Sequence, residues 1–220
     1  MRDSEKEAII DRYNRRLAEF GYDQRTLGWT KGKHDLRFYV LLSHWNLDNM
    51  DIMDFGCGFG DMYAYCRRHF PNVRYHGIDL NPELIREGKR QYPEADLTSG
   101  DALVSGLGRK YDYIFSSGVH NLKVSDNWRF IEESFELFHE FSTRGFALNF
   151  LSNKVEYELD HTYHSDPAQV LDLCYKYSNR VVFRNDYMAF EFAVFVDKQD
   201  DFDKEYGVYP EYLRFIEKDR

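Results

Sequence analysis

Apolar side chains recur at intervals of three and four residues in several parts of the chain, which is the spacing of one helix face. The pattern is clearest over residues 4–20 and over the residues that follow Ser125. The two stripes are Ile9, Tyr13, Leu17 and Phe20 in the first segment, and Trp128, Ile131, Phe135 and Phe138 in the second. Further helices are predicted over 35–45, 61–69, 82–92 and 167–177, with Asn81 and Pro82 as N-cap and first-turn residues.

Short apolar runs between these helices predict buried β-strands. The runs cover residues 52–55, 73–77, 97–102, 111–115 and 145–151. Strands that alternate with helices are typical of a parallel sheet in an α/β protein. Two more strands, 180–183 and 190–196, follow each other with a turn at Asn185 and Asp186, so an antiparallel hairpin is expected to close the sheet.

Composition is that of a folded α/β domain with appendages. The chain has 220 residues, 43% of them hydrophobic and 17% aromatic, and its mean hydropathy of -0.66 indicates a very polar surface. No window approaches the roughly 18 apolar residues of a membrane span, and Met1 to Lys6 are charged rather than a signal peptide. We expect a cytoplasmic protein.

The charge balance bears on possible partners. With 38 acidic and 29 basic residues, the formal net charge is -9, which disfavours binding to nucleic acid. The three cysteines form no Cys-x-x-Cys pair, so reduced and unpaired thiols are expected.

The stretch with the clearest chemistry is residues 51–61, Asp-Ile-Met-Asp-Phe-Gly-Cys-Gly-Phe-Gly-Asp. A predicted strand runs into Gly56, Gly58 and Gly60, and a predicted helix follows. Glycine allows positive φ and leaves the backbone N–H groups open to a ligand. The order of strand, glycine turn and helix predicts a nucleotide-binding βα unit.

Two acids refine this prediction. Asp79 ends the second strand nineteen positions after Gly60, where a carboxylate can accept hydrogen bonds from ribose hydroxyls. Asp54, two positions before the first glycine, would repel a phosphate but suits a ligand that carries an ammonium group. A dinucleotide oxidoreductase is disfavoured, because its third glycine would fall where this chain has Asp61.

The segment Asp54-Phe-Gly-Cys-Gly-Phe-Gly60 resembles the first motif of the class I S-adenosylmethionine-dependent methyltransferases, and Gly77-Ile-Asp-Leu-Asn-Pro82 resembles the second. The resemblance covers about residues 34–196. It implies S-adenosylmethionine as cofactor and a Rossmann-like α/β fold, with a seven-stranded, mostly parallel sheet, an antiparallel last strand and helices on both faces. It does not specify the acceptor, because the family methylates many nucleophiles.

The chain is accordingly expected to have three parts. Residues 34–196 form the methyltransferase core, residues 1–33 an N-terminal helix and lid loop, and residues 197–220 a charged extension with a short helix over 210–218. The first helix either covers the cofactor cleft, carries a partner or packs on the sheet edge. Trp29 lies in the loop and is expected to close over the ligand.

The resemblance also implies contacts to the cofactor. Asp101, in Gly100-Asp101-Ala102, is expected to accept the adenine amino group, and Arg37 could reach the cofactor carboxylate. The full expected set is Trp29, Arg37, Asp54, Gly56, Cys57, Gly58, Gly60, Asp79, Leu80, Asn81, Gly100, Asp101, Ala102, Ser116 and Ser117.

The loop after the fourth strand should face the transferred methyl group, because ligands bind at the carboxyl ends of parallel strands. It begins Ser116-Ser117-Gly118-Val119 and lacks the Asn/Asp-Pro-Pro-aromatic tetrad of enzymes that methylate amides or base amino groups. Methylation of DNA adenine or protein glutamine is therefore disfavoured. His120 follows at once and is the expected catalytic base for a hydroxyl acceptor; the alternative is a histidine that hydrogen-bonds the loop backbone.

The polar segment 154–166 is expected to overhang the acceptor. The predicted substrate-binding residues are Asn121, Tyr157, His161, Tyr163 and His164. His161 and His164 beside Asp160 form only a weak metal pattern, since a third well-placed ligand is missing. No metal is expected.

The sequence thus predicts a methyltransferase that transfers a methyl group to oxygen or nitrogen of a small polar metabolite by direct displacement. We expect no nucleic-acid or membrane partner, and the oligomeric state stays open. One alternative is an enzyme that cleaves or cyclises the same cofactor and releases methylthioadenosine. Another is a non-catalytic partner protein that keeps the fold, which the intact glycine loop, Asp79 and Asp101 disfavour.

Overall fold

The computed structural model describes residues 1–29 and 33–216, and its centre is a seven-stranded sheet in the order β3-β2-β1-β4-β5-β7-β6. The strands are β1 (Asp51–Phe55), β2 (Arg74–Asp79), β3 (Asp96–Ser99), β4 (Tyr111–Ser117), β5 (Ser142–Leu151), β6 (Arg180–Arg184) and β7 (Glu191–Asp197). Neighbours from β3 to β5 pair in parallel, and β7 is antiparallel to both β5 and β6. The predicted Rossmann-like sheet with its antiparallel last strand is confirmed.

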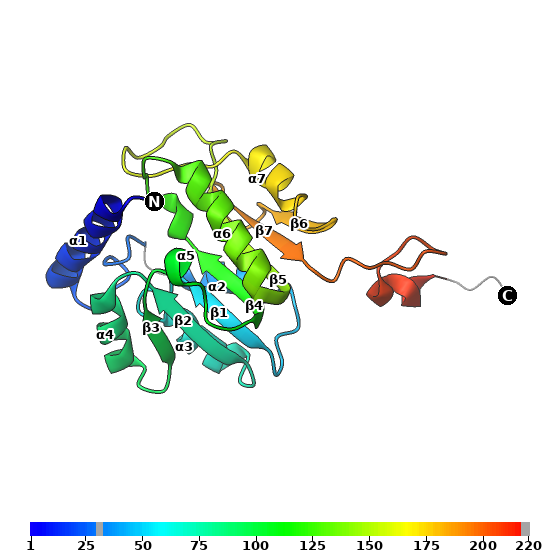
Figure 1. The fold of residues 1–220 in the computed structure, drawn as a ribbon, viewed down its shortest axis with the longest axis horizontal. Helices are drawn as coiled ribbons and strands as arrows, with labels where there is room; N and C mark the ends of the chain where they lie inside the picture. Colours follow the sequence, from blue (N-terminus) through cyan, green and yellow to red (C-terminus); the bar gives the residue numbers. More distant parts are fainter. Residues whose placement is uncertain (30–32, 217–220) are drawn as a thin grey trace.

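Helices cover both faces of this sheet (Figure 1). They are α1 (Asp3–Phe20), α2 (His34–Leu42), α3 (Asp61–His69), α4 (Pro82–Gln91), α5 (Ala102–Ser105), α6 (Asn127–Phe141) and α7 (Pro167–Cys174), with 3-10 turns η1 (Val119–Asn121) and η2 (Pro210–Phe215). Two cores result. One joins the sheet to α5, α6 and α7, and the other joins it to α2, α3 and α4.

The helix α6 shows how the sequence pattern becomes packing. Its N-cap, Asp126, accepts a hydrogen bond from the Arg129 backbone N–H, which satisfies one of the free donors of the first turn. Ile131, Phe135 and Phe138 from the predicted stripe are fully buried against the sheet. The apolar face that fixes α6 on the sheet was therefore readable from spacing alone.

Some element boundaries differ from those predicted. The helix predicted to reach Trp45 ends at Leu42, and the Trp45 indole instead stacks on Tyr113 and donates to Asp197 at 3.2 Å. The helix predicted to Tyr177 ends at Cys174. The four-residue α5 was not predicted, because so short a helix shows no period.

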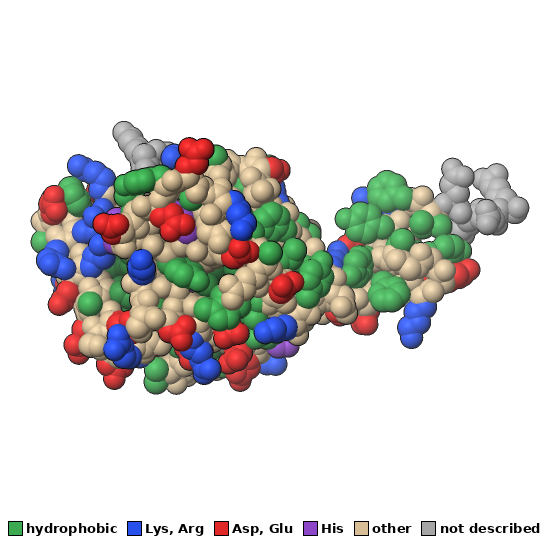
Figure 2. Space-filling view, turned by 90° about the horizontal axis from the view of Figure 1, so that it is seen from above, with side chains coloured by type: hydrophobic (Ala, Val, Ile, Leu, Met, Phe, Trp, Pro, Cys, Tyr) green, Lys and Arg blue, Asp and Glu red, His purple; other side chains and the backbone are tan. Residues whose placement is uncertain are grey.

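The two ends of the chain lie differently against the core. The helix α1 contacts α4 and contains no buried residue. After β7 the chain leaves the domain and projects away from it, as Figures 1 and 2 show. The short helix predicted over 210–218 is present as the 3-10 helix η2, which ends at Phe215. Residues 217–220 lie outside the described part, as do residues 30–32 of the predicted lid loop. Within the described chain, no helix combines the length and apolar character needed to cross a bilayer.

Candidate functional site

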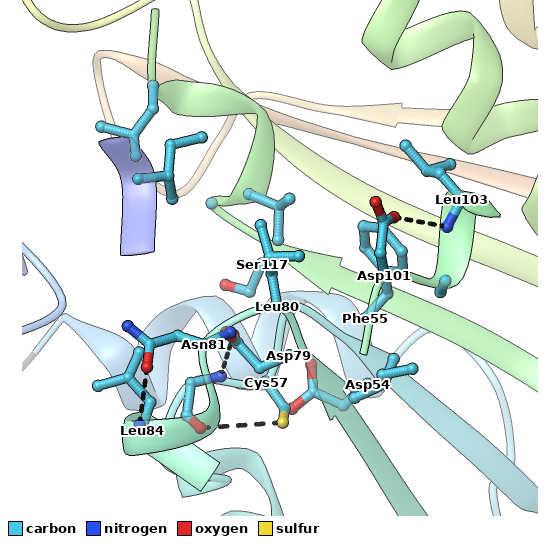
Figure 3. Close-up of a pocket in the computed structure, with 18 of the residues that line it drawn as sticks. Asp54, Phe55, Cys57, Asp79, Leu80, Asn81, Leu84, Asp101, Leu103 and Ser117 are labelled. Atoms are coloured by element: carbon cyan, nitrogen blue, oxygen red, sulfur yellow. Dashed lines mark hydrogen bonds between the residues drawn. The ribbon is translucent and has the colours of Figure 1, made fainter. Parts of the chain in front are cut away.

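A cavity of about 610 Å³ lies at the carboxyl ends of β1, β2 and β4. Figure 3 shows Asp54 and Cys57 from the end of β1 near Asp79 and Leu80 from the end of β2, with Asp101 and Ser117 contributed by neighbouring segments. This is the edge at which ligands bind in open parallel sheets, and the volume suits a small organic ligand.

The glycine loop forms the floor of the cavity. Gly56 has a φ of 75°, and a Cβ built there would lie 2.1 Å from Val119 Cγ2. The backbone N–H groups of Gly56 and Cys57 both donate to the Ile78 carbonyl oxygen, at 2.8 and 3.1 Å. These contacts hold the loop against β2, and only glycine combines the required conformation with this close approach.

Asp79 connects the end of β2 to the glycine loop. Its carboxylate accepts hydrogen bonds from the Gly58 and Asn81 backbone N–H groups, each at 2.8 Å. Burial raises the pKa of Asp79, and these two backbone donors act in the opposite direction. The carboxylate is thus fixed in place at the cavity wall, where a ribose would need an acceptor.

Asp54 is the most perturbed acid of the site. Its side chain is 3% exposed and accepts a hydrogen bond from the Tyr75 hydroxyl at 2.7 Å. Burial, opposed by the Tyr75 hydrogen bond and assisted by the charges of Asp79 and Asp61, raises the pKa of Asp54 to about 7. A cationic ligand near this carboxyl would favour its charged form.

Asp101 joins two elements around the cavity. It caps α5 by accepting from the Leu103 backbone N–H at 3.1 Å, a contact drawn in Figure 3. The same carboxylate pairs with Lys6 Nζ of α1 at 2.7 Å. If an adenine amino group binds here, the Asp101 carboxylate would accept hydrogen bonds from it and from Lys6 together. The sequence had not predicted Lys6 as a residue of the site.

Most of the expected cofactor residues meet at this cavity. Those that line it are Trp29, Asp54, Gly56, Cys57, Gly58, Asp79, Leu80, Asn81, Gly100, Asp101, Ala102 and Ser117. Arg37, Gly60 and Ser116 do not. Gly60 lies below the loop, where Leu97 occupies the space beside it, and Ser116 is fully buried in β4.

The expected position of Arg37 needs correction. Its side chain is 3% exposed, and its Nε donates to Glu191 Oε2 at 2.9 Å while Nη2 pairs with the same carboxylate. The Trp29 ring covers the guanidinium at 4.0 Å. The guanidinium of Arg37, which was expected to meet the cofactor carboxylate, is instead neutralised by the buried carboxylate of Glu191, a residue far away in the sequence.

The expected position of His120 is also corrected. The ring is 1% exposed, lies against Phe130 and Phe150, and has Nε2 at 3.0 Å from Ser134 Oγ. Burial lowers the pKa of His120 to about 3. Because the imidazole points into the core between β5 and α6, the structure does not bring it to the cavity, and we do not retain it as a base.

The predicted substrate residues lie outside the cavity as well. Asn121 accepts from the Leu151 backbone N–H at 3.0 Å, and His164 Nδ1 lies 2.8 Å from the Ser152 carbonyl oxygen. Tyr163 packs on the core, His161 is exposed, and Tyr157 is 74% exposed. The segment 152–166 is hydrogen-bonded back onto β5 and η1, and none of the five predicted substrate residues lines the cavity.

Sequence reasoning missed a second set of lining residues. They come from α1, the start of α2 and the exposed side of α6, and include Lys6, Ile9, Ile10, Tyr13, His34, Phe38, Arg129 and Glu133. Ile9 and Tyr13 belong to the stripe that spacing had predicted, but spacing alone does not say what a stripe faces. Among the described residues, no three His, Cys, Asp or Glu side chains gather as a metal site.

Comparison with known proteins gives consistent matches. The family described as "Methyltransferase domain" matches residues 52–140. The Mycobacterium tuberculosis protein called "Putative methyltransferase Rv1506c" is 30% identical over 158 residues, which cover 69% of this chain and 95% of that protein. A trans-aconitate 2-methyltransferase of Escherichia coli O157:H7 is 31% identical over 78 residues, 35% of this chain and 31% of that enzyme.

Solved structures agree with the fold. The magnesium protoporphyrin IX methyltransferase ChlM of Synechocystis PCC 6803, with bound SAH, superposes with a TM-score of 0.64 at 14% identity, covering 90% of this chain and 97% of ChlM. The DhpI–SAH complex gives a TM-score of 0.64 at 15% identity, covering 86% and 95%. At such identities the likeness concerns the fold alone.

Proposed function

Because the chain belongs to the class I S-adenosylmethionine-dependent methyltransferases, we propose that it methylates an oxygen or nitrogen atom of a small polar metabolite by direct displacement. The cofactor is S-adenosylmethionine, whose sulfonium supplies an electrophilic methyl group. The acceptor class is the proposed part, and the following observations support it.

The residues of the cavity fit the cofactor. Gly58 has a φ of 56°, and a Cβ there would lie 3.1 Å from the Leu27 side chain, so a larger residue would strain the loop that borders the cavity. Asp79 would hold the ribose hydroxyls, Asp101 the adenine amino group, and Asp54 the ammonium group. These assignments are those that the family's motifs imply, and the acceptor chemistry of the three carboxylates and their shared position on the cavity wall support them.

Displacement at a methyl carbon requires alignment above all. The acceptor atom must lie in line with the breaking C–S bond at near-attack distance, and effective concentration supplies most of the rate. The rigid backbone around Gly56 and Gly118 can provide this alignment: Trp29 packs where a Cβ at Gly118 would be, and Val119 does the same at Gly56. Both contacts lie at the side of the cavity formed by the loop after β4.

A single observation carries the preference for a small acceptor, namely the position of α1 across the cavity. Ile9, Ile10 and Tyr13 line it from above the strand ends, and Lys6 is bonded to Asp101 on the far wall. A folded protein or a duplex would have to displace this helix. The net charge of -9 also opposes nucleic acid as a substrate.

The name of one relative favours an oxygen acceptor. It is the malonyl-[acyl-carrier protein] O-methyltransferase 1 of Ilyobacter polytropus, which is 24% identical over 158 residues, 68% of this chain and 54% of that enzyme. The trans-aconitate 2-methyltransferase is named for a small carboxylic acid. We therefore place small carboxylic and hydroxy acids first among the acceptors to be tried.

An acceptor screen tests the proposal. The full chain is incubated with S-adenosylmethionine and pools of small carboxylic acids, phenols, amines and sugars, in parallel with protein and RNA pools. Release of S-adenosylhomocysteine and a methylated small product are expected. Methylation confined to protein or RNA would overturn the acceptor class, and release of methylthioadenosine without any methylated product would indicate cleavage of the cofactor.

A further inference from the structure

The imidazole of His34 is a buried polar group without a hydrogen-bond partner. His34 begins α2 and lines both the cofactor cavity and an adjoining cavity of about 570 Å³. Its side chain is 4% exposed, and neither ring nitrogen has a hydrogen-bond partner among the described residues. Since buried polar atoms are nearly always bonded, two unused nitrogens at a cavity wall indicate that a ligand group belongs there.

The charged side chains around the glycine loop are acidic, so the carboxylate of the cofactor has no cationic partner among them. Asp54, Asp61 and Asp79 all line this part of the cavity. The amino-acid end of S-adenosylmethionine carries both an ammonium group and a carboxylate. Asp54 can accept the ammonium group and Asp79 is placed for the ribose, but none of the three acids offers a donor to the carboxylate.

The other cationic side chains of the cavity are already paired. Lys6 bonds to Asp101 at 2.7 Å, and Arg129 bonds to Glu133 at 2.7 Å, both away from the glycine loop. Among the described lining residues next to the glycine loop, His34 is the basic side chain whose ring nitrogens have no hydrogen-bond partner.

We propose that His34 binds the carboxylate of the methionine portion of S-adenosylmethionine by donating a ring N–H to it. This inference rests on the cofactor and not on the identity of the acceptor, so it can be tested before any acceptor is known. A hydrogen bond from an imidazole to a carboxylate is charge-assisted and therefore among the stronger kinds.

The surroundings of His34 support this role. Its Nδ1 lies 3.9 Å from Asp61 Oδ2, while Asp61 Oδ1 accepts from the Tyr22 and Tyr92 hydroxyls at 2.7 and 2.9 Å. Two tyrosines thus hold a carboxylate beside the ring. In this structure burial, with a smaller contribution from Arg37, lowers the pKa of His34 to about 3, so the ring is neutral at pH 7 and has one N–H. A ligand carboxylate bound at the ring would act in the opposite direction and raise this pKa.

Arg37 is the competing residue for this role. Two of its nitrogens are committed to Glu191, but Nη1 is buried without a partner beneath Trp29. It would reach the cofactor only if Trp29 moved away. His34 needs no such movement, because it already lines the cavity.

Calorimetry with three ligands isolates the carboxylate. The probes are S-adenosylhomocysteine, decarboxylated S-adenosylmethionine, which keeps the ammonium group, and methylthioadenosine, which lacks the whole amino-acid end. Each is titrated into wild type, His34→Ala, His34→Asn and the matched surface variant His69→Ala. His34→Ala is expected to weaken S-adenosylhomocysteine by about 10- to 100-fold and the other two ligands by less than about 3-fold.

The pattern across ligands decides the outcome. His34→Asn, which keeps an N–H donor, should recover part of the affinity, and His69→Ala should match wild type. An equal loss of affinity for all three ligands would show that His34 has a structural role, and this would overturn the proposal. An unchanged affinity for S-adenosylhomocysteine would also overturn it and would favour Arg37 as the carboxylate-binding residue. Normal binding of methylthioadenosine by His34→Ala shows that the variant is folded. Failure of the acceptor screen would leave this result unaffected.

Discussion

At the scale of single residues, buried charge separates the ligand-binding groups from the structural ones. Asp54 is buried and Asp79 is partly buried at the cavity wall, and the fold raises the pKa of both. Arg37 and Glu191 are equally buried, but they neutralise each other inside the core. A buried acid without a cation destabilises the protein unless a ligand compensates, so perturbed carboxyls at a cavity wall are expected where a cationic cofactor binds.

Asp54→Asn should make the ligand-free protein more stable at neutral and alkaline pH. The pKa of Asp54 is raised to about 7, so between about pH 4 and 7 the folded state binds a proton that the unfolded state loses, and stability falls as the pH rises. Asparagine can still accept from Tyr75 and has no charge to bury. Urea unfolding should show a gain of about 2 to 4 kcal/mol at pH 8 that disappears near pH 4.

The same substitution should weaken S-adenosylmethionine, because the ammonium group loses its carboxylate. Methylthioadenosine, which has no ammonium group, is the control ligand and should bind normally. A stability difference that stays constant from pH 4 to 8 would show that the charge of Asp54 is not its cause.

The Arg37–Glu191 pair predicts non-additive effects on stability. Arg37→Met leaves a buried carboxylate without its cation, which should cost about 3 to 5 kcal/mol of unfolding free energy. Adding Glu191→Gln should restore much of that loss. A double-mutant cycle from chemical unfolding measures the coupling, and additive losses would mean that the two side chains act independently.

At the scale of elements, α1 is held over the cavity by polar contacts and not by a buried apolar face. It contains no buried residue. Lys6 bonds to Asp101, and Asn81 Nδ2 donates to Asn14 Oδ1 at 2.9 Å, so the helix is tied to walls that the cofactor would also touch. Elements attached in this way open at low free-energy cost, which suits a cover over a site that must exchange ligands.

Lys6→Met should therefore accelerate release of the cofactor product. It removes the ion pair to Asp101, whose net contribution at this half-buried position is about 1 kcal/mol, so the dissociation rate should rise about 3- to 10-fold. Stopped-flow displacement of S-adenosylhomocysteine measures the rate. Lys89→Met on the exposed side of α4 is the matched control, and equal rates for both variants would contradict a covering role of α1.

At the scale of the whole molecule, the core and the C-terminal extension are distinct. The sheet and its helices enclose two hydrophobic cores, whereas the chain beyond β7 projects from the domain with Phe202, Tyr212 and Phe215 exposed (Figure 2). Its main tie to the core is Arg180, which pairs with Glu211 and lies 4.4 Å from the Tyr209 ring. None of the described residues of this extension, 198–216, lines the cofactor cavity.

Removal of residues 202–220 should leave the domain folded and able to bind the cofactor. The deletion loses a surface ion pair and a cation–π contact, which together contribute about 1 kcal/mol, so the melting temperature should fall by about 2 to 4 °C. Thermal unfolding and S-adenosylhomocysteine titration test this. Loss of cooperative unfolding would show that the extension belongs to the folded core.

The sequence by itself determined the parts of this protein that depend on neighbouring residues. The strand, the three glycines and the acid of the next strand are local backbone requirements, so spacing predicted the nucleotide-binding βα unit with Asp54 and Asp79. The resemblance of these motifs to the methyltransferases implied the cofactor and Asp101, and all three acids line the cavity. The alternation of strands and helices fixed a parallel sheet for the same reason.

Only the tertiary structure decided where isolated polar side chains point. Arg37 forms an ion pair with Glu191, and His120 is hydrogen-bonded to Ser134 and packed between two phenylalanines. His34 is left at the cavity with both ring nitrogens unbonded among the described residues. The partners of Arg37 and His120 lie ten or more residues away in the sequence and are brought together when helices pack on the sheet. Spacing specifies the face of an element, but packing of distant elements decides what that face meets.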